Sequence, residues 1–424
     1  MISLSQIREN IILKQGVHYF DFTASGLAYA PIEKRIADML PEYANTHSES
    51  SSNSIKTQKL YEHAKSELKR LLGLGDEFYL MATGHGSSAA IKKFQELLGI
   101  YIPPATRRRL GMVRPENLPL VIVGAFEHHS NEVSWRSGLC EVVRIGLNDR
   151  GGINLNELKS VLSAAKAQNR EIIASFSLAS NVTGVIAEYA KISALVREAG
   201  GIMAYDAAAA SPYMQIAARY FDALYLSPHK LLGGVGSCGL LAVRKGLFGF
   251  EKPTFAAGGT VSYVSRNSHK FIAQPERLEE GGTPPITQLV RAWLAYALRE
   301  EVGLERIERT ETELKQYFTA RLEKVPNLIN YCPRNQRRLG IFAFNIAGIS
   351  PYELANALSE RYGIQTRAGC ACAGPYGHEL LGLVDDAPLE QKPGWLRASV
   401  HYTHTKADID YFIESLKECI KDFV

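Results

Sequence analysis

Short β-rich runs alternate with helical patterns through most of the first 245 residues, and this alternation constrains the fold more than any other feature of the sequence. Between the runs, the segment from residue 87 places Ile91, Phe94 and Leu98 at helical spacing, and another helical segment closes at Gly200, a residue suited to a helix C-cap. The runs lie near residues 78, 118, 170, 201, 222 and 239 and read FYLMA, LPLVIVGA, EIIASFSL, GIMAYD, DALYLS and GLLAVR. This part of the chain is therefore predicted to be a parallel or mixed sheet covered by helices.

The pattern changes after Pro284. A helical stretch leads into a second one near 303–324, and the runs LGIFAFNI, IQTRAG and WLRASV then read as strands. A single core usually stops growing before a chain reaches 424 residues. We therefore expect an α/β protein with a large mixed-sheet domain at 20–285 and a smaller α/β domain made of 1–19 and 286–424.

Charge and cysteine content narrow the class of protein. The 48 basic and 44 acidic residues give a net charge of +4, which offers little electrostatic support for nucleic-acid binding. Six cysteines in a chain of this length do not form the dense disulfide framework of a small secreted domain, so reduced thiols are expected. Neither a signal peptide nor a membrane-spanning segment is recognisable, and we expect a cytoplasmic protein without a membrane partner.

Lys230 lies where the run DALYLS passes through Ser227, Pro228 and His229 into a glycine-rich turn. A lysine amine needs desolvation or suitable neighbours before it can do covalent chemistry, and a cleft at the end of a strand supplies both. The alternative is a surface lysine that happens to follow a strand. Asp206 ends the run GIMAYD, 24 residues earlier, so both side chains are expected at one edge of the sheet, although an aspartate there is often a loop or cap residue.

Two further segments have the chemistry of a cofactor site. In TGHGSSAAIKK, Ser87 and Ser88 lie at a predicted helix N-terminus, which favours a phosphate, although serines there also cap helices. His128 follows the run LPLVIVGA and could lie flat on an aromatic ring, whereas a lone histidine is more often structural.

The combination of E-H-H, S-N-V-T-G, D-A-A, S-P-H-K, E-x-G-T-P and R-x-G-x-x-C resembles class V aminotransferase-fold enzymes over roughly residues 18–420. The likeness is greatest to group II cysteine desulfurases and selenocysteine lyases. It implies the fold of type I transferases that depend on pyridoxal 5'-phosphate (PLP), and a homodimer.

The resemblance also implies roles for individual residues. Lys230 would hold PLP covalently, Asp206 would pair with the ring nitrogen, and His128 would stack on the ring and take part in catalysis. Further contacts would be Asn181 near the ring oxygen and substrate, Ser87, Ser88, Ser227 and His229 at the phosphate with Thr283 of the neighbouring subunit, and Arg397 and Arg367 on the substrate side.

One position departs from the family pattern. Three residues after Asp206 the family commonly has a glutamine, and this chain has Ala209. The missing hydrogen bond should alter the electronics of the bound cofactor, which leaves substrate and reaction type open. The D-A-A sequence is also similar to that of molybdenum cofactor sulfurases.

Cys370 and Cys372 lie in RAGCACAGPYGH, and the resemblance makes Cys372, five residues after Arg367, the sulfur-accepting nucleophile. A metal half-site with His378 is an alternative that lacks further ligands at suitable spacing, so no metal is expected. A further alternative is a structural role for both cysteines, with different chemistry on the cofactor.

Together these features predict a PLP enzyme that removes sulfur or selenium from cysteine or selenocysteine, gives alanine, and passes sulfur to an acceptor protein. A different class V reaction on another amino acid and a silent sulfur-transfer scaffold are the alternatives. The Pro- and Arg-rich connection at 101–119 is expected to be a solvated loop, with a partner contact as the alternative.

Overall fold

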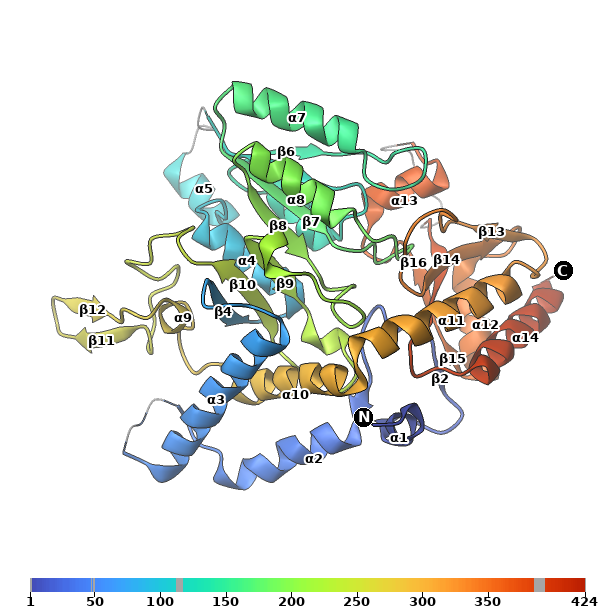
Figure 1. Cartoon of the computed structure of the whole chain (residues 1–424), viewed down its shortest axis with the longest axis horizontal. Helices are drawn as coiled ribbons and strands as arrows, with labels where there is room; N and C mark the ends of the chain where they lie inside the picture. The colour runs from blue at the N-terminus through green and yellow to red at the C-terminus, as the bar shows by residue number, and fades with distance from the viewer. Residues whose placement is uncertain (1, 47, 49, 112–116, 385–392, 424) are drawn as a thin grey trace.

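A computed structural model describes residues 2–46, 48, 50–111, 117–384 and 393–423. Its largest element is a seven-stranded mixed sheet near the centre of the molecule (Figure 1). Strand β10 is antiparallel to both of its neighbours, and the other pairs are parallel. The strands lie in the order β4 (Phe78–Thr83), β10 (Gly239–Arg244), β9 (Ala223–Leu226), β8 (Ile202–Asp206), β7 (Ile172–Ser177), β5 (Leu120–Val123) and β6 (Glu141–Arg144). The predicted mixed sheet is confirmed, and β6 is a strand that the sequence patterns did not indicate.

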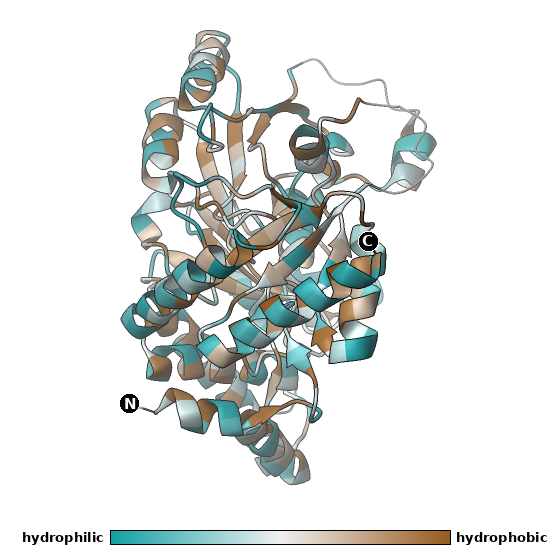
Figure 2. Cartoon of the chain, turned by 90° about the vertical axis from the view of Figure 1, so that its right-hand side faces the viewer, coloured by the Kyte–Doolittle hydropathy of each residue, from teal (hydrophilic) through white to brown (hydrophobic). Residues whose placement is uncertain are grey.

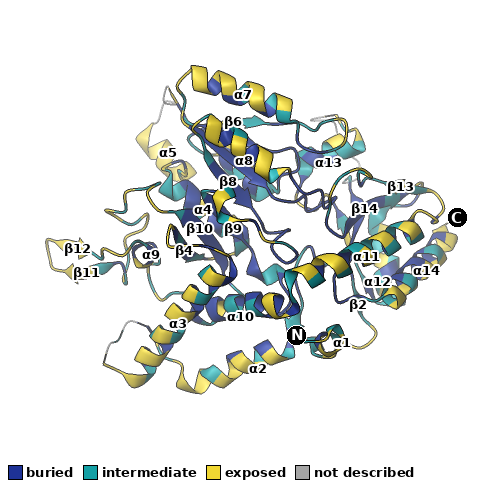
Figure 3. Cartoon of the chain, in the orientation of Figure 1, coloured by how far each residue is buried: buried dark blue, intermediate teal, exposed yellow. Residues whose placement is uncertain are grey.

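Alternate residues of these strands enter two separate cores, one on each face of the sheet. Leu120 and Ile122 of β5 belong to the core beneath α7 (Leu155–Ala167), α8 (Tyr189–Glu198) and α10 (Ile286–Val302). Val121 and Val123 belong to the core beneath α4 (Gly86–Leu97). Burial on both faces explains why the strands read as continuous apolar runs, and Figure 3 shows the sheet as buried residues between half-exposed helices.

A smaller antiparallel sheet is built from β13 (Leu328–Asn330), β14 (Ile341–Ile346), β17 (Trp395–Ser399) and β16 (Arg367–Gly369), in that order. It packs against α11 (Leu304–Leu322), α12 (Pro351–Tyr362) and α14 (Lys406–Phe423), whose apolar faces turn inward (Figure 2). The core between them includes Phe318, Phe344, Leu358, Leu396 and Phe412.

The run IQTRAG does not form one strand. It divides at Thr366 into β15 (Ile364–Gln365), which pairs in parallel with β2 (His18–Tyr19), and β16, which pairs with β17. The division joins the N-terminal segment to the smaller sheet.

Helix α10 packs against α3 (Ser52–Leu71) and α2 (Ala30–Met39), and its buried side chains belong to the core of the large sheet. Ile7 of α1 (Leu4–Glu9) lies in the same core, whereas Phe20 lies in the core of the smaller sheet. The domain boundaries near residues 20 and 285 stay a prediction.

The connection at 101–119 contains a short helix, α5 (Pro104–Leu110), none of whose residues is buried, so the expectation of a loop was wrong for that stretch; residues 112–116 lie outside the described residues. No helix in the described part of the chain is long and apolar enough to cross a membrane.

The remaining elements are short. They are β1 (Ile11–Ile12) paired with β3 (Ala28–Tyr29), α6 (Val133–Arg136), the hairpin β11 (Val261–Val264) and β12 (His269–Phe271), α9 (Pro275–Leu278), α13 (Gly374–Leu381), and the one-turn helices η1 (Leu40–Glu42), η2 (His129–Asn131), η3 (Ala218–Tyr220) and η4 (Pro228–Lys230).

Candidate active site

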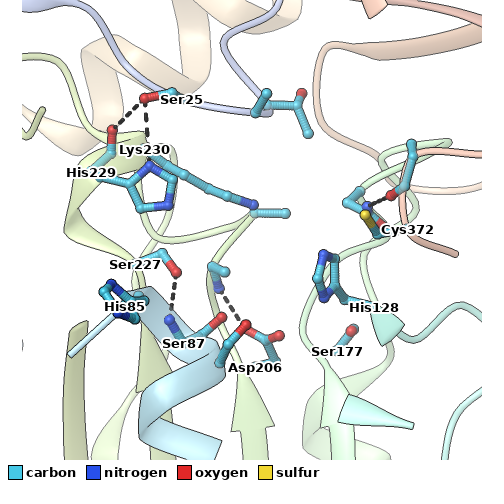
Figure 4. A pocket seen from close by; sticks show the side chains of 18 of the residues that line it. Ser25, His85, Ser87, His128, Ser177, Asp206, Ser227, His229, Lys230 and Cys372 are labelled. Carbon is cyan, nitrogen blue, oxygen red and sulfur yellow. Dashed lines mark hydrogen bonds between the residues drawn. The ribbon is translucent and has the colours of Figure 1, made fainter. Parts of the chain in front are cut away.

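A cavity of about 460 Å³ lies at the edge of the large sheet where the parallel strands end. Asp206 ends β8, Ser227 follows β9, and His128 lies in the connection after β5, so the parallel arrangement brings them to one edge. Arg397 of β17 and Cys372 reach the same cavity from the side of the smaller sheet. Figure 4 shows the side chains facing one another across this space.

Lys230 ends the one-turn helix η4, directly after β9, and its side chain extends into the cavity (Figure 4). Burial lowers the pKa of Lys230 to about 8; the carboxylate of Asp206 opposes this shift, and the charges of Arg397 and Arg367 add to it. The turn beyond it requires glycine, since a Cβ on Gly234 would lie 1.9 Å from the backbone oxygen of Pro228. A lysine whose neutral amine is accessible near neutral pH can act as a nucleophile and as a base.

Asp206 lies on the floor of the cavity, where burial raises its pKa above the usual value. The backbone N–H of Ala208 donates to its Oδ1 at 2.9 Å, and this hydrogen bond and the charge of Lys230 favour the ionised form. A buried carboxylate held in this way can pair with a protonated ring nitrogen. Ala209 lines the same cavity, so no side-chain amide is present at that position.

The N-terminus of α4 forms a second wall. The backbone N–H of Ser87 donates to Ser227 Oγ at 2.7 Å, and a Cβ on Gly86 would lie 2.8 Å from that same oxygen. Ser88 Oγ lies 2.5 Å from Ser130 Oγ. Burial, with the charge of Lys230, lowers the pKa of His229 to about 4, so this ring is neutral near pH 7. Hydroxyl groups and backbone N–H groups at a helix N-terminus suit a phosphate.

His128 stands on the opposite wall, below Cys372 (Figure 4). Its Nδ1 accepts a hydrogen bond from the backbone N–H of Ser130 at 3.1 Å, and burial and the charge of Lys230 lower its pKa to about 4. The ring is therefore neutral, with its proton on Nε2, and suited to lie against an aromatic ring.

Glu127, the glutamate of the E-H-H pattern, was given no role from the sequence, and it is buried next to His128 in the chain. Its Oε1 accepts hydrogen bonds from the backbone N–H groups of Gly124 and Ser177, and its Oε2 accepts from Asn131 Nδ2 and Ser177 Oγ, at 2.7–3.1 Å. Burial raises its pKa to about 7 against the effect of these donors. A glutamate beside two histidines gives no sequence signal for this role, which depends on β7 lying next to β5.

Asp21 was also missed. Its Oδ1 accepts from Arg397 Nη2 at 2.7 Å, and its Oδ2 accepts from Arg367 Nε at 3.2 Å. Arg397 also donates from Nη1 to the backbone oxygen of Asn181 at 2.9 Å, and burial lowers its pKa while Asp21 opposes the shift. One carboxylate therefore orients both arginines, across more than 340 residues of sequence.

Cys372 lines the cavity, and Cys370 is not among the lining residues. Both are exposed, whereas Cys140, Cys238, Cys332 and Cys419 are buried. No disulfide joins the six cysteines, all of which lie within the described residues. An exposed thiol that lines the same cavity as a buried lysine amine is suited to nucleophilic chemistry.

The structure thus brings almost all of the predicted site residues to one cavity: Lys230, Asp206, His128, Ser87, Ser88, Asn181, Ser227, His229, Arg397, Arg367 and Cys372. Thr283 lies elsewhere, in a second hollow of about 800 Å³, where its Oγ1 accepts from Asn45 Nδ2 at 3.1 Å. Among the described residues, no group of three or more His, Cys, Asp or Glu side chains is placed to hold a metal ion. The individual roles of these residues stay predictions.

Comparison with known proteins identifies the family. The sequence matches the class V aminotransferase family over residues 18–412. The chain belongs to the class V aminotransferase family. Members of this family are PLP-dependent enzymes, so the predicted fold type and enzyme class are confirmed.

Several proteins with similar sequences or structures are named cysteine desulfurases or probable cysteine desulfurases. A probable cysteine desulfurase of Pyrococcus abyssi is 26% identical over 98% of this chain and 97% of its own length. One of Streptomyces coelicolor is 26% identical over 92% and 90%. Among solved structures, the apo cysteine desulfurase of Thermococcus onnurineus is 26% identical with a TM-score of 0.84, covering 100% of this chain and 99% of that one. A cysteine desulfurase of Escherichia coli with an S-sulfonic acid, 22% identical with a TM-score of 0.81 over the full length of both chains, shares the fold.

Proposed function

We propose that this protein binds PLP through Lys230 and removes sulfur from cysteine, leaving alanine and a persulfide on Cys372. The observation that carries the proposal is that an exposed thiol and a buried lysine amine line the same cavity. The relatives named probable cysteine desulfurases, which match nearly the whole chain, support it.

The residues of the cavity fit the cofactor. Asp206 would face the ring nitrogen, His128 the ring, and the N-terminus of α4 with Ser87 and Ser227 the phosphate. Two buried side-chain oxygens that line the cavity, Asn181 Oδ1 and Ser237 Oγ, have no hydrogen-bond partner among the described residues, as expected of groups that bind a ligand.

Bound PLP withdraws electrons from the α-carbon of an attached amino acid. Arg397, fixed by Asp21 and Asn181, would bind the substrate α-carboxylate, with Arg367 near it. Lys230 would take the α-proton, because its side chain lies inside the cavity and its lowered pKa, about 8, makes the neutral amine far more populated near neutral pH than in an ordinary lysine.

Cys372 would accept the sulfur. Its thiolate attacks the substrate sulfur, so that an S–S bond forms as the bond from Cβ to sulfur breaks. The electron pair of the broken bond stays on the carbon fragment, which takes up protons and leaves as alanine. The thiol proton passes to solvent, and no outside oxidant is needed. A thiol of an acceptor protein would then attack the outer sulfur of the persulfide, so that this sulfur moves to the acceptor and the Cys372 thiolate is released.

The test is an assay of the purified holoenzyme with cysteine, selenocysteine and a panel of other amino acids. We expect alanine from cysteine and a persulfide on Cys372 by mass spectrometry in wild type and in Cys370→Ser, and neither in Cys372→Ser. Alanine and persulfide at the wild-type rate in Cys372→Ser would refute the nucleophile. Products from another amino acid alone would favour a different class V reaction, and no product at all would favour a scaffold.

We also propose a homodimer in which Thr283 reaches the cofactor phosphate of the neighbouring subunit, since Thr283 lies outside its own subunit's cavity. The free thiols of Cys370 and Cys372 suit a reducing compartment, which supports a cytoplasmic location.

A further inference from the structure

The loop at 370–374 is attached to the large sheet's side of the cavity by His129. The backbone N–H of His129 donates to the carbonyl oxygen of Cys372 at 2.8 Å. In return, the backbone N–H of Gly374 donates to His129 Nε2 at 2.7 Å. One residue thus makes hydrogen bonds on both sides of Ala373.

The loop has backbone conformations that need such support. Ala371 and Cys372 have φ values of +48° and +59°, in the left-handed region that residues with a Cβ rarely adopt. Such conformations persist where the surroundings hold them. Besides His129, Asn181 donates from Nδ2 to the carbonyl oxygen of Ala371 at 2.6 Å.

His129 lies next to His128 at the start of the one-turn helix η2, and His128 lines the cavity. His128 is the N-cap of η2 and His129 its first residue, with their ring centroids 6.4 Å apart. This turn therefore places the ring of His128 at the cavity, while the ring of His129 accepts a hydrogen bond from the loop at 370–374.

The bond from Gly374 requires a particular state of the ring. Nε2 can accept a hydrogen bond only when the imidazole is neutral with its proton on Nδ1. Protonation would place an N–H on Nε2 opposite the N–H of Gly374. Burial lowers the pKa of His129, the charge of Glu132 opposes this shift, and that of Arg136 adds to it, so the ring is neutral near pH 7.

The other charged groups around this turn are largely paired with one another. Glu132 forms ion pairs with Arg136 and, at 3.8 Å, with Arg144. Arg144 also pairs with Glu379 of α13 at 2.5 Å, and His128 is neutral near pH 7. The thiols of Cys370 and Cys372 lie on the loop itself.

We propose that His129 is a positioning residue that holds Cys372 against the cofactor cavity and releases the loop when its ring is protonated. The proposal deepens the function given above, in which Cys372 is the nucleophile. The hydrogen bonds between His129 and the loop at 370–374, and the loop's backbone conformation, do not depend on which reaction the protein catalyses.

The test compares two substitutions with different chemistry. In His129→Gln, Oε1 can take the place of Nε2 as an acceptor and does not titrate, whereas His129→Phe removes the acceptor at every pH. His269→Gln, an exposed histidine on the β11–β12 hairpin, is the matched control. The rate of modification of Cys372 by 4,4'-dithiodipyridine is measured on the holoenzyme without cysteine, with the site identified by mass spectrometry, at pH 7.5 and at a series of lower pH values.

At pH 7.5 we expect His129→Phe to react about 2- to 10-fold faster than wild type, the effect of one lost hydrogen bond, and His129→Gln to match wild type. As the pH is lowered, the ratio of the wild-type rate to the Phe-variant rate should rise towards one, while the Gln variant stays slow at each pH. Because each comparison is made at one pH, the ionisation of the thiol cancels. The visible absorption of the cofactor and the thermal midpoint should be those of wild type in both variants.

Equal rates in all proteins, or equal changes in the Gln and Phe variants, would overturn the proposal. The result is independent of the reaction, since the reagent reports on the thiol and not on turnover. If cysteine gave no alanine while the reactivity pattern held, the nucleophile assignment would fall and the attachment would stand. If both hold, kcat for alanine formation should fall in His129→Phe with KM little changed and recover in His129→Gln.

Discussion

Lys230 combines burial with a position directly after a strand, and this makes it the residue on which cofactor attachment should depend. We expect Lys230→Ala to lose the visible absorption of covalently held PLP and all amino-acid turnover. Lys245→Ala, an exposed lysine after β10, should keep both. Absorption spectra of the two purified variants decide this, and a visible band that survives in Lys230→Ala would show that another amine holds the cofactor.

Asp21 supplies a negative charge between Arg397 and Arg367, the two arginines proposed to bind the substrate. Its charge should favour a substrate with one carboxylate over one with two. We predict that Asp21→Asn binds dicarboxylates such as succinate more tightly, by roughly tenfold for one removed charged contact. Inhibition constants against cysteine turnover measure this, with the exposed Asp38→Asn as control. An unchanged constant for succinate would mean that Asp21 does not set this preference.

The residues of the site differ in whether the sequence alone could predict that they lie together. Lys230, Asp206 and the serines of α4 follow strands or begin a helix, so pattern and family resemblance place them together. Asp21, Glu127 and His129 act through contacts with chain segments 50 to more than 300 residues away. Such contacts exist only after folding; Glu127 and His129 belong to the E-H-H pattern, but that pattern does not indicate which groups they contact.

At the level of elements, the edge strand β4 shows how the sheet ends on its outer side. The backbone N–H groups of Leu80 and Ala82 donate to Glu276 and Glu280 at 2.8 and 2.9 Å, so carboxylates take the place of a further strand. Lys65, mostly buried, pairs with Glu280 at 2.7 Å and with Glu276 at 3.9 Å. Capping of this kind satisfies an edge that would otherwise pair with other chains.

We predict that Lys65→Met lowers the free energy of unfolding by about 3–5 kcal/mol, because it leaves two buried carboxylates with less positive charge. The control Lys34→Met removes an exposed pair with Asp38 and should cost at most about 1 kcal/mol. Urea denaturation of both variants measures the difference. Equal losses would show that the buried cluster contributes no more than a surface pair.

The elements themselves were predictable where burial is uniform. The six apolar runs of the large sheet all became strands, because each is buried on both faces. Strand β6, with the burial of its residues ranging from exposed to half-buried, lacks that apolar signal. The run at 364–369 divided because its two halves pair with different partners, which depends on where the N-terminal segment lies.

For the whole molecule, buried histidines should make stability fall in acid. His404, whose ring contacts the backbone oxygen of Tyr19 at 2.9 Å, has its pKa lowered to about 4 by burial. The unfolded chain takes up this proton near pH 6.5 and the folded chain only near pH 4. Stability from this group is therefore present above pH 6.5 and is lost as the pH falls towards 4.

Thermal midpoints measured between pH 7 and pH 4 should fall less steeply for His404→Gln than for wild type, with His269→Gln as the control. Identical slopes for wild type and His404→Gln would exclude a contribution from His404. Burial also raises the pKa of Glu311 to about 7, which opposes the trend between pH 4.5 and 7, so the comparison of slopes is the informative quantity.

The proposed dimer makes a prediction at the same scale. Light scattering of the holoenzyme should give twice the chain mass of 46.8 kDa. Thr283→Ala should weaken PLP retention without altering the residues that line its own cavity. A monomer with full cofactor occupancy would refute the shared site.

The position of β10 between β4 and β9 also has a consequence for how a ribosome delivers this fold. Strand β4 ends at Thr83, and its neighbour in the sheet does not begin until Gly239. At about 5–20 residues per second, roughly 8–30 s separate the synthesis of the two strands. The parallel strands β5, β7, β8 and β9 can assemble during that interval. Strand β4 has no partner strand until β10 has been synthesised. In the growing chain, the segment that leads into Ser87 and Ser88 is therefore the part of the large sheet most exposed to unwanted association.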